Sequence, residues 1–405
     1  MRLSVLVCAL ALMAANAQAA SARWIGTWAA SPTPPMAATG TGLFASMLPP
    51  AFNDQTIVQV VRLSTGGSQL RLRLTNEYGP KPLAIGAVRV ALVGPDNALV
   101  AGSDRSVTFA GAKAATIPAG APMLSDLVDL PTRPLARLQV SLYLPGEAPV
   151  CTCHLQGNER VRVSQPGDWT ERTVPAAKGS AQYRAFLSGV EVKTAQPARV
   201  VVAFGDSITD GFGATVGADR RWPDRLAERL AAKYPGRAMA VANAGIGGNR
   251  VLSDGVIGAF GQSALTRFDR DVLSIAGVTD VIVLEGVNDL GSSKASPPTA
   301  DSLILGYRQM IDRAHAHGLK VIGATILPYG GAGYFGPAGE AVRQTLNAWI
   351  RAPGHFDAVI DLDAAVRDPA RPERMRANLQ AGDWLHPNDA GYRAMGDAVD
   401  LALFR

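Results

Sequence analysis

The stretch 199–211, RVVVAFGDSITDG, decides the fold of the second half of this 405-residue chain. Its first part, Arg199 to Phe204, reads as a continuous apolar strand, as expected for a sheet that is covered on both faces. Ser207 follows where the strand gives way to a loop and a helix, so its hydroxyl is expected at the edge of the sheet. A Gly-Asp-Ser triplet alone is weak evidence for chemistry, because such a triplet is usually a turn with a helix cap.

The rest of this half alternates between apolar strands and helical patterns. Trp222, Leu226, Leu230 and Tyr234 recur every four residues, which places them on one face of a helix. Further helices are expected near 299–317, 338–351 and 389–403, and further strands at 238–242, 281–284, 321–326 and 358–362. This alternation predicts a parallel sheet with helices on both sides and a site at the carboxyl ends of the strands.

In the first half of the chain, apolar residues recur with a different period. Residues 69–74, QLRLRL, alternate between leucine and polar side chains, the pattern of a half-buried strand, and residues 137–144 repeat it. Residues 56–63 and 84–93 are further strand candidates, and turn sequences rich in glycine and proline separate them. Short strands without a convincing helix between them predict an antiparallel β-sandwich over 20–195, and Thr194 to Pro197 form the expected linker to a second domain, 196–405.

The first 19 residues have the pattern of a secretory signal peptide. Arg2 precedes an apolar segment from Leu3 to Ala15, which is too short to cross a bilayer, and Ala17-Gln18-Ala19 provides a small-residue cleavage site. We expect cleavage after Ala19, with Ala22 as the second choice. No later segment has 18 consecutive apolar residues, so we expect a secreted or periplasmic protein without a stable membrane anchor.

Two cysteines remain after cleavage, in the run Cys151-Thr152-Cys153-His154. An exported protein can form disulfides, and a local disulfide or a pair of free buried thiols is the first interpretation. A metal site is a distant third, because no further ligands are visible in the sequence. His154 is interpreted as a structural histidine.

Four short clusters of polar residues and glycine follow strands of the second half. They are 205–211, GDSITDG; 243–249, NAGIGGN; 286–289, GVND; and 383–388, DWLHPN. Each cluster alone could be an ordinary loop, but four of them at successive strand ends indicate one composite site.

With these four blocks in order, residues 204–392 resemble the SGNH hydrolases, also called the GDSL family of lipases and esterases. One departure is small, since Ile208 stands where the family name implies leucine. The resemblance implies a flavodoxin-like three-layer α/β/α hydrolase domain. The first half also resembles a β-sandwich that precedes this domain in some exported bacterial members.

The resemblance implies roles that the chemistry of ester hydrolysis also requires. Ser207 is the expected nucleophile, His386 the base that activates it, and Asp383 the group that orients the imidazole. The backbone N–H groups of Ser207 and Gly248 and the side-chain amide of Asn288 are the expected oxyanion donors. The remaining histidines, and the aspartates Asp206, Asp210 and Asp289, are interpreted as structural.

These roles predict a serine esterase that transfers an acyl group to water without a metal or an organic cofactor. Short acyl chains are favoured, because no lid-like apolar segment is visible. The substrate is then a small-molecule or polymer-linked ester; a polysaccharide O-acetyl esterase and a lipase- or phospholipase-type acylhydrolase remain alternatives. An acyltransferase and a carbohydrate-binding surface protein are the alternative classes of function. The net charge of +5, from 39 basic and 34 acidic residues, and the scattered arginines argue against a nucleic-acid partner.

Overall fold

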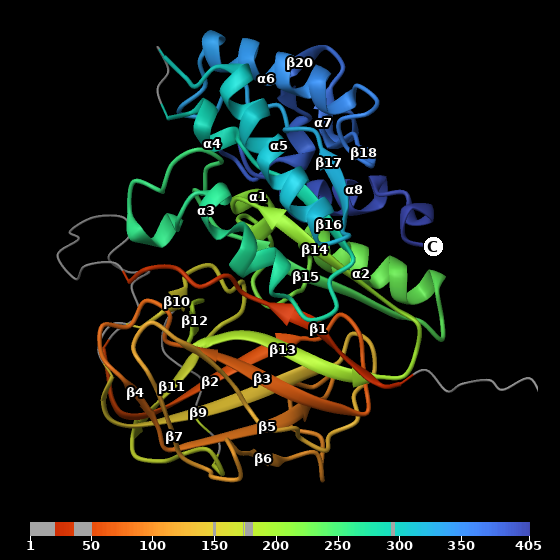
Figure 1. The fold of residues 1–405 in the computed structure, drawn as a ribbon. Helices are drawn as coiled ribbons and strands as arrows, with labels where there is room; N and C mark the ends of the chain where they lie inside the picture. Colours follow the sequence, from red (N-terminus) through yellow and green to blue (C-terminus); the bar gives the residue numbers. More distant parts are fainter. Residues whose placement is uncertain (1–20, 36–50, 149–150, 173, 175–180, 293–295) are drawn as a thin grey trace, which may run out of the picture.

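A computed structural model describes residues 21–35, 51–148, 151–172, 174, 181–292 and 296–405 (Figure 1). The predicted signal peptide, residues 1–19, lies outside these ranges. Within them, none of the helices is both long enough and apolar enough to cross a lipid bilayer.

The second half of the chain is built on a five-stranded parallel sheet. Its order is β15-β14-β16-β17-β18, so the first strand in the chain lies second in the sheet, the flavodoxin-like order. The strands are β14 (Ala198–Gly205), β15 (Ala238–Gly245), β16 (Asp280–Leu284), β17 (Lys320–Ala324) and β18 (Ala358–Ile360). Every residue of β16 is buried, as the apolar runs predicted.

Helices cover both faces of this sheet, which gives the three predicted layers (Figure 1). Helix α2 packs with α8 on one face, and α5 packs with α3 and α6 on the other. The helices are α1 (Ser207–Asp210), α2 (Trp222–Lys233), α3 (Ala264–Phe268), α4 (Val287–Leu290), α5 (Ala300–Ala316), α6 (Pro337–Arg351), α7 (Leu362–Val366) and α8 (Asp389–Ala398). A short hairpin, β19 (Arg367–Asp368) with β20 (Arg371–Met375), follows α7.

Two predicted elements are divided in the structure. The helix expected at 389–403 ends at Ala398, and a separate 3₁₀ turn, Leu401–Phe404, begins where the Asp400 side chain accepts a hydrogen bond from Ala402 N. The strand expected at 84–93 consists of β4 (Leu83–Ile85) and β5 (Ala87–Val93). Gly86 lies between them, and a Cβ there would lie 2.5 Å from the Tyr143 ring, so the position requires glycine.

The first half is all-β, and its two main sheets face each other. One has the order β1-β13-β3-β8 and the other β11-β2-β9-β5-β6, with antiparallel neighbours throughout. Leucines from β3 and from β9 are fully buried in one shared core, so the alternating pattern marks the inner faces. The strands are β1 (Arg23–Ala29), β2 (Phe52–Arg62), β3 (Gln69–Thr75), β6 (Arg105–Val107), β8 (Pro122–Leu124), β9 (Arg137–Ala148), β11 (Arg162–Pro166) and β13 (Leu187–Thr194). Two-stranded pairs join β4 to β7 (Ala115–Ile117) and β10 (Cys153–His154) to β12 (Arg184–Ala185).

The two halves pack closely against each other. Strand β1 lies along β15 at the junction (Figure 1), and Gly26 N donates to Ala276 O at 2.8 Å. The core of the all-β part includes Val200, Ala238 and Ala240 at the beginnings of β14 and β15. The all-β part therefore supports the α/β part directly, and it also reaches the candidate site.

Candidate active site

The structure brings these four clusters, 205–211, 243–249, 286–289 and 383–388, together at the carboxyl ends of the parallel strands. Ser207 follows β14 and is the first residue of α1, Gly248 lies in the loop after β15, and Asn288 lies in α4 after β16. Asp383 and His386 lie in the loop before α8. The predicted site residues thus come from four separate segments but lie at one edge of the sheet.

A continuous hydrogen-bonded chain joins three of these side chains. Ser207 Oγ lies 2.8 Å from His386 Nε2, and His386 Nδ1 lies 2.6 Å from Asp383 Oδ2. The other carboxylate oxygen of Asp383 accepts from the backbone N–H groups of Leu385 and His386. The Phe212 ring packs against the imidazole with the two ring centres 4.4 Å apart. The imidazole is therefore held at both nitrogens and along one face.

The environment of Asp383 keeps its carboxyl ionised. Partial burial opposes ionisation, but the hydrogen bonds from the ring and the backbone of His386 outweigh it and hold the pKa of Asp383 well below its usual range. An ionised Asp383 accepts from His386 Nδ1–H, which leaves Nε2 without a proton and directed at the Ser207 hydroxyl.

Ser207 is itself one of the three predicted oxyanion donors, and the other two lie at the same cavity. Gly248 and Asn288 line the same cavity as Ser207. Gly248 has a φ of 75°, and a Cβ there would lie 2.5 Å from the Phe260 ring, so only glycine fits. Asn288 Nδ2 donates to Asn249 O at 2.9 Å, and Tyr334 Oη donates to Asn288 Oδ1 at 3.2 Å. These contacts orient the amide and leave one of its two N–H groups for a ligand.

The aspartates beside these groups are structural, as expected. Asp206 caps α1, since its side chain accepts from Ile208 N at 2.8 Å, and Asp289 accepts from Val251 N and Leu252 N. Both carboxyls are deeply buried, and burial raises the pKa of Asp206 to about 7 and that of Asp289 to about 6.

Arg267 organises the loops around the site, a role that the sequence did not reveal. Its fully buried guanidinium donates to Gly205 O and Ala244 O at the ends of β14 and β15, and to the Asn249 side chain. It also lies over the Phe204 ring, 4.0 Å from the ring centre. A single arginine inside a short helix carries no motif, so only the tertiary contacts show this role.

The site opens into a cavity of about 590 Å³ that is lined by Ser207 and His386. Most of its lining is apolar or aromatic, and Arg250, Gln156 and the His154–Asp210 pair supply further polar groups. The apolar and aromatic residues are Leu155, Phe212, Ile246, Ile257, Ala259, Phe260, Tyr334 and Leu385. A cavity of this size is typical of a small-molecule site.

The all-β part supplies one wall of the cavity. His154, Leu155 and Gln156 follow the two cysteines and line it beside Ser207. His154 Nδ1 lies 3.0 Å from Ser31 O and Nε2 lies 2.8 Å from Asp210 Oδ1. With Asp210 ionised, both partners can only accept hydrogen bonds, so both ring nitrogens carry protons and His154 is an imidazolium.

His154 is thus the satisfied structural histidine that the sequence indicated, but it also connects the two halves. Burial lowers its pKa, yet the charge and hydrogen bond of Asp210 and the bond to Ser31 O outweigh burial, so its pKa is raised. Asp210 Oδ2 in turn accepts from Gly247 N at 3.2 Å. Through Asp210, His154 therefore holds the loop that carries Gly248.

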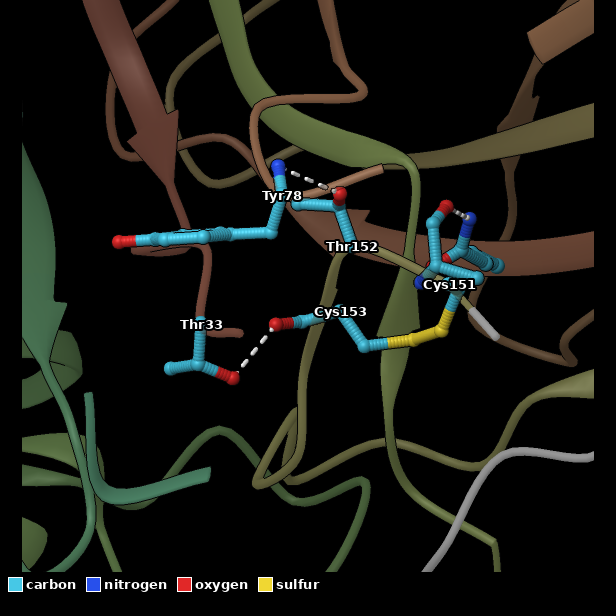
Figure 2. The surroundings of a disulfide bond; sticks show 7 residues. Thr33, Tyr78, Cys151, Thr152 and Cys153 are labelled. Atoms are coloured by element: carbon cyan, nitrogen blue, oxygen red, sulfur yellow. Dashed lines mark hydrogen bonds between the residues drawn. A yellow bond between two sulfur atoms is a disulfide. The ribbon is translucent and has the colours of Figure 1, made fainter. Parts of the chain in front are cut away.

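A disulfide joins Cys151 and Cys153, which confirms the first interpretation of this run (Figure 2). Hydrogen bonds hold the segment at two residues: Thr33 Oγ1 donates to Cys153 O at 2.9 Å, and Tyr78 N donates to Thr152 Oγ1 at 3.0 Å. Among the described residues, no group of three or more histidine, cysteine, aspartate or glutamate side chains is placed to hold a metal ion.

The other histidines lie away from the cavity. His315 and His317 are at the carboxyl end of α5, where His315 Nε2 lies 2.9 Å from Asp357 Oδ2 at the surface. His355 stacks on Trp349, with 4.4 Å between the ring centres. The geometry therefore leaves His386 as the histidine in contact with Ser207.

Comparison with known proteins agrees with this geometry. Residues 203–394 match the model of the GDSL-like Lipase/Acylhydrolase family, and this range includes all the predicted site residues. The chain contains a GDSL-like acylhydrolase domain. It is accordingly a hydrolase that acts on ester bonds, and the parallel sheet with its strand-end site is the core of this domain.

Solved structures with a similar fold cover about half of the chain, and no curated protein matches it. The lipase/acylhydrolase from Enterococcus faecalis is 25% identical and covers 49% of this chain and 92% of its own, with a TM-score of 0.37. A member of the lipolytic protein G-D-S-L family from Veillonella parvula DSM 2008 is 20% identical, with coverages of 51% and 98% and a TM-score of 0.35. A carbohydrate acetylesterase family member from Sinorhizobium meliloti is 16% identical, with coverages of 51% and 97% and a TM-score of 0.41.

Proposed function

We propose that the protein is an exported serine esterase that hydrolyses carboxylic esters through an acyl-Ser207 intermediate. The observation that carries the proposal is the unbroken chain from Asp383 through His386 to Ser207 Oγ, with contacts of 2.6 and 2.8 Å, at a cavity of about 590 Å³. A serine hydroxyl is a weak nucleophile unless a base takes its proton, and this chain supplies the base.

In the first step, Ser207 Oγ attacks the carbonyl carbon of the ester and His386 Nε2 takes the hydroxyl proton. His386 then donates that proton to the leaving alcohol as the tetrahedral intermediate collapses to the acyl-enzyme. In the second step, His386 takes a proton from water, the hydroxide attacks the acyl carbon, and Ser207 leaves with the proton. Asp383 stabilises the imidazolium that forms in each step.

The negative charge of each tetrahedral intermediate needs donors that are already in place. The N–H of Ser207 is the first amide of α1 and has no acceptor within that helix. The N–H of Gly248 and the free N–H of Asn288 Nδ2 complete the proposed set. The contact of Asn288 with Asn249 O supports this role, because it fixes the amide before the substrate binds.

The proposed substrates are esters with short acyl chains, attached to a small molecule or to a polymer. The apolar lining of the cavity suits an acyl group or an aryl or alkyl alcohol. Export is supported by the Cys151–Cys153 disulfide, because disulfides persist in oxidising compartments. The mass of the mature N-terminus, measured on protein recovered from the periplasm or the medium, tests export and cleavage after Ala19.

The activity is tested with p-nitrophenyl acetate, butyrate and octanoate. We expect Ser207→Ala to lose on the order of 10⁴–10⁶ in kcat, whereas Ser253→Ala, at an exposed serine, keeps wild-type rates. The acyl-chain proposal expects kcat/KM to be highest for acetate or butyrate, and a maximum at octanoate would contradict it. Release of acetate from acetylated xylan separates a polymer-linked substrate from a small one.

A further inference from the structure

Arg250 is a cationic side chain that lines the catalytic cavity, and none of the described residues is its partner. It lies in the loop after β15, next to Asn249, and it lines the cavity together with Ser207 and His386. The side chain is half-buried, and its Nε is buried with no hydrogen-bond acceptor among the described residues. A guanidinium has five N–H donors, and leaving such donors unpaired in a partly desolvated position is unfavourable.

The usual structural roles of a half-buried arginine are absent at this position. Within the described ranges, the side chain of Arg250 makes no ion pair at 4.0 Å or less, no hydrogen bond and no contact over an aromatic ring. The buried arginine of the neighbouring helix, Arg267, has all three kinds of contact. Arg267 and Arg250 therefore differ in role, since Arg267 stabilises the fold and Arg250 presents its N–H donors to the cavity.

The nearby carboxylate of Asp289 does not neutralise Arg250 by direct contact. Its two oxygens accept from Val251 N and Leu252 N, at 2.8 and 3.1 Å. The charge of Arg250 acts on Asp289 only through space. Asp210, whose carboxylate lines the cavity, is already paired with the imidazolium of His154. The cavity thus keeps one positive charge that its own acidic residues leave uncompensated.

We propose that Arg250 binds an anionic group of the substrate, a carboxylate or a phosphate, while the ester carbonyl lies at Ser207. This inference rests on the proposed esterase function and narrows its substrate class to esters that carry a negative charge. Arginine suits such a group because its planar fork matches two oxygens of an oxyanion. A cavity of about 590 Å³ lets one ligand contact Ser207 and Arg250 together.

The charge could lie on the acyl side or on the alcohol side of the ester, and two pairs of substrates distinguish these cases. On the acyl side, mono-p-nitrophenyl adipate is compared with p-nitrophenyl methyl adipate, which has a similar length but no charge. On the alcohol side, 4-acetoxybenzoate is compared with methyl 4-acetoxybenzoate. In one of the pairs, we expect the wild-type enzyme to prefer the anion by about tenfold to hundredfold in kcat/KM, the range of a charge-assisted hydrogen bond.

Substitution of Arg250 then tests whether this residue causes the preference. Arg250→Gln should bring the ratio of anionic to neutral kcat/KM close to one, and Arg250→Lys should keep a reduced preference. Arg308→Gln removes an equal charge from an exposed position on α5 and should leave the ratio unchanged. The wild-type preference should also weaken as salt is added.

Two results would overturn the proposal. One is a wild-type enzyme that hydrolyses the neutral esters but prefers the anion in neither pair. The other is a preference that survives in Arg250→Gln or, if that variant does not fold, is undiminished in Arg250→Lys. Failure of the esterase proposal gives a different result, because the neutral esters would then not be hydrolysed either.

Discussion

Replacing His154 by alanine tests whether the all-β part holds the active-site loops. The side chains of His154 and Asp210 are only 7% and 3% exposed, and the two form a buried charged contact between the halves of the molecule. Removal of one partner of a buried ion pair leaves the other charge uncompensated, which costs about 3–5 kcal/mol of stability. We therefore expect the free energy of unfolding to fall by that amount in His154→Ala.

His315→Ala is the matched control. His315 Nε2 lies 2.9 Å from Asp357 Oδ2, close to the 2.8 Å of the His154–Asp210 pair, but these side chains are 45% and 36% exposed. An exposed pair contributes about 1 kcal/mol or less. Urea unfolding followed by tryptophan fluorescence measures both variants. In His154→Ala/Asp210→Asn the uncompensated carboxylate is absent, so part of the lost stability should return.

The effect of His154 should also depend on pH. Its pKa is raised in the folded state, so its contribution is complete below the ordinary histidine pKa of about 6.5 and is lost as the pH rises through the folded-state value. The difference between wild type and His154→Ala should therefore be larger at pH 6 than at pH 9. Activity on p-nitrophenyl butyrate should fall as well, because Asp210 holds Gly247 N. A loss of stability no larger than in His315→Ala, independent of pH, would refute the reasoning.

Three further variants address the active-site loop and the buried carboxyls. Asn288→Ala should lower kcat by about 10²–10³-fold through loss of one oxyanion donor. A kcat equal to that of the wild-type enzyme in a steady-state assay would exclude this role. Gly248→Ala should lose both activity and stability, because φ is 75° and the added Cβ meets the Phe260 ring; wild-type kcat and urea midpoint would contradict this. Burial raises the pKa of Asp206 to about 7, so the folded state holds a proton there that the unfolded state releases near pH 4, and stability should fall as the pH rises from about 4 to 7. Asp206→Asn keeps an acceptor for Ile208 N, and it should make this fall in stability less steep by up to about 1.4 kcal/mol per pH unit. An unchanged dependence of the unfolding free energy on pH in urea titrations would argue against a protonated Asp206.

The sequence predicted the parallel sheet and the positions of the candidate site residues because both leave local patterns. A strand buried on both faces must be mostly apolar, as β14 is from Val200 to Phe204 and β16 from Val281 to Leu284, and the loops at their ends need glycine. The side chains of Ser207, Asp383 and His386 were then placed by their position after these strands and before α8. The contacts of 2.6 and 2.8 Å between them are what the structure adds.

Features that depend on distant contacts were outside the reach of the sequence. His154 precedes Asp210 by 56 residues and lies in the all-β part, so no local sequence pattern indicates that it reaches the active-site loop. The free guanidinium of Arg250 and the fully bonded one of Arg267 look alike in sequence, because their difference lies only in their tertiary partners. The break of the strand at Gly86, whose close neighbour is Tyr143, was missed for the same reason. The break of the last helix before Leu401 was also missed, although its cap, Asp400, is local.

The central claim is that Ser207 carries the acyl group during turnover, and covalent trapping tests it most directly. The full chain is mixed with p-nitrophenyl butyrate, quenched in acid within milliseconds, digested and analysed by mass spectrometry. We predict a butyryl adduct on the peptide that contains Ser207, a burst of p-nitrophenol that matches the enzyme concentration, and neither signal in Ser207→Ala. An adduct on another residue, or turnover at the wild-type rate by Ser207→Ala, would contradict the account.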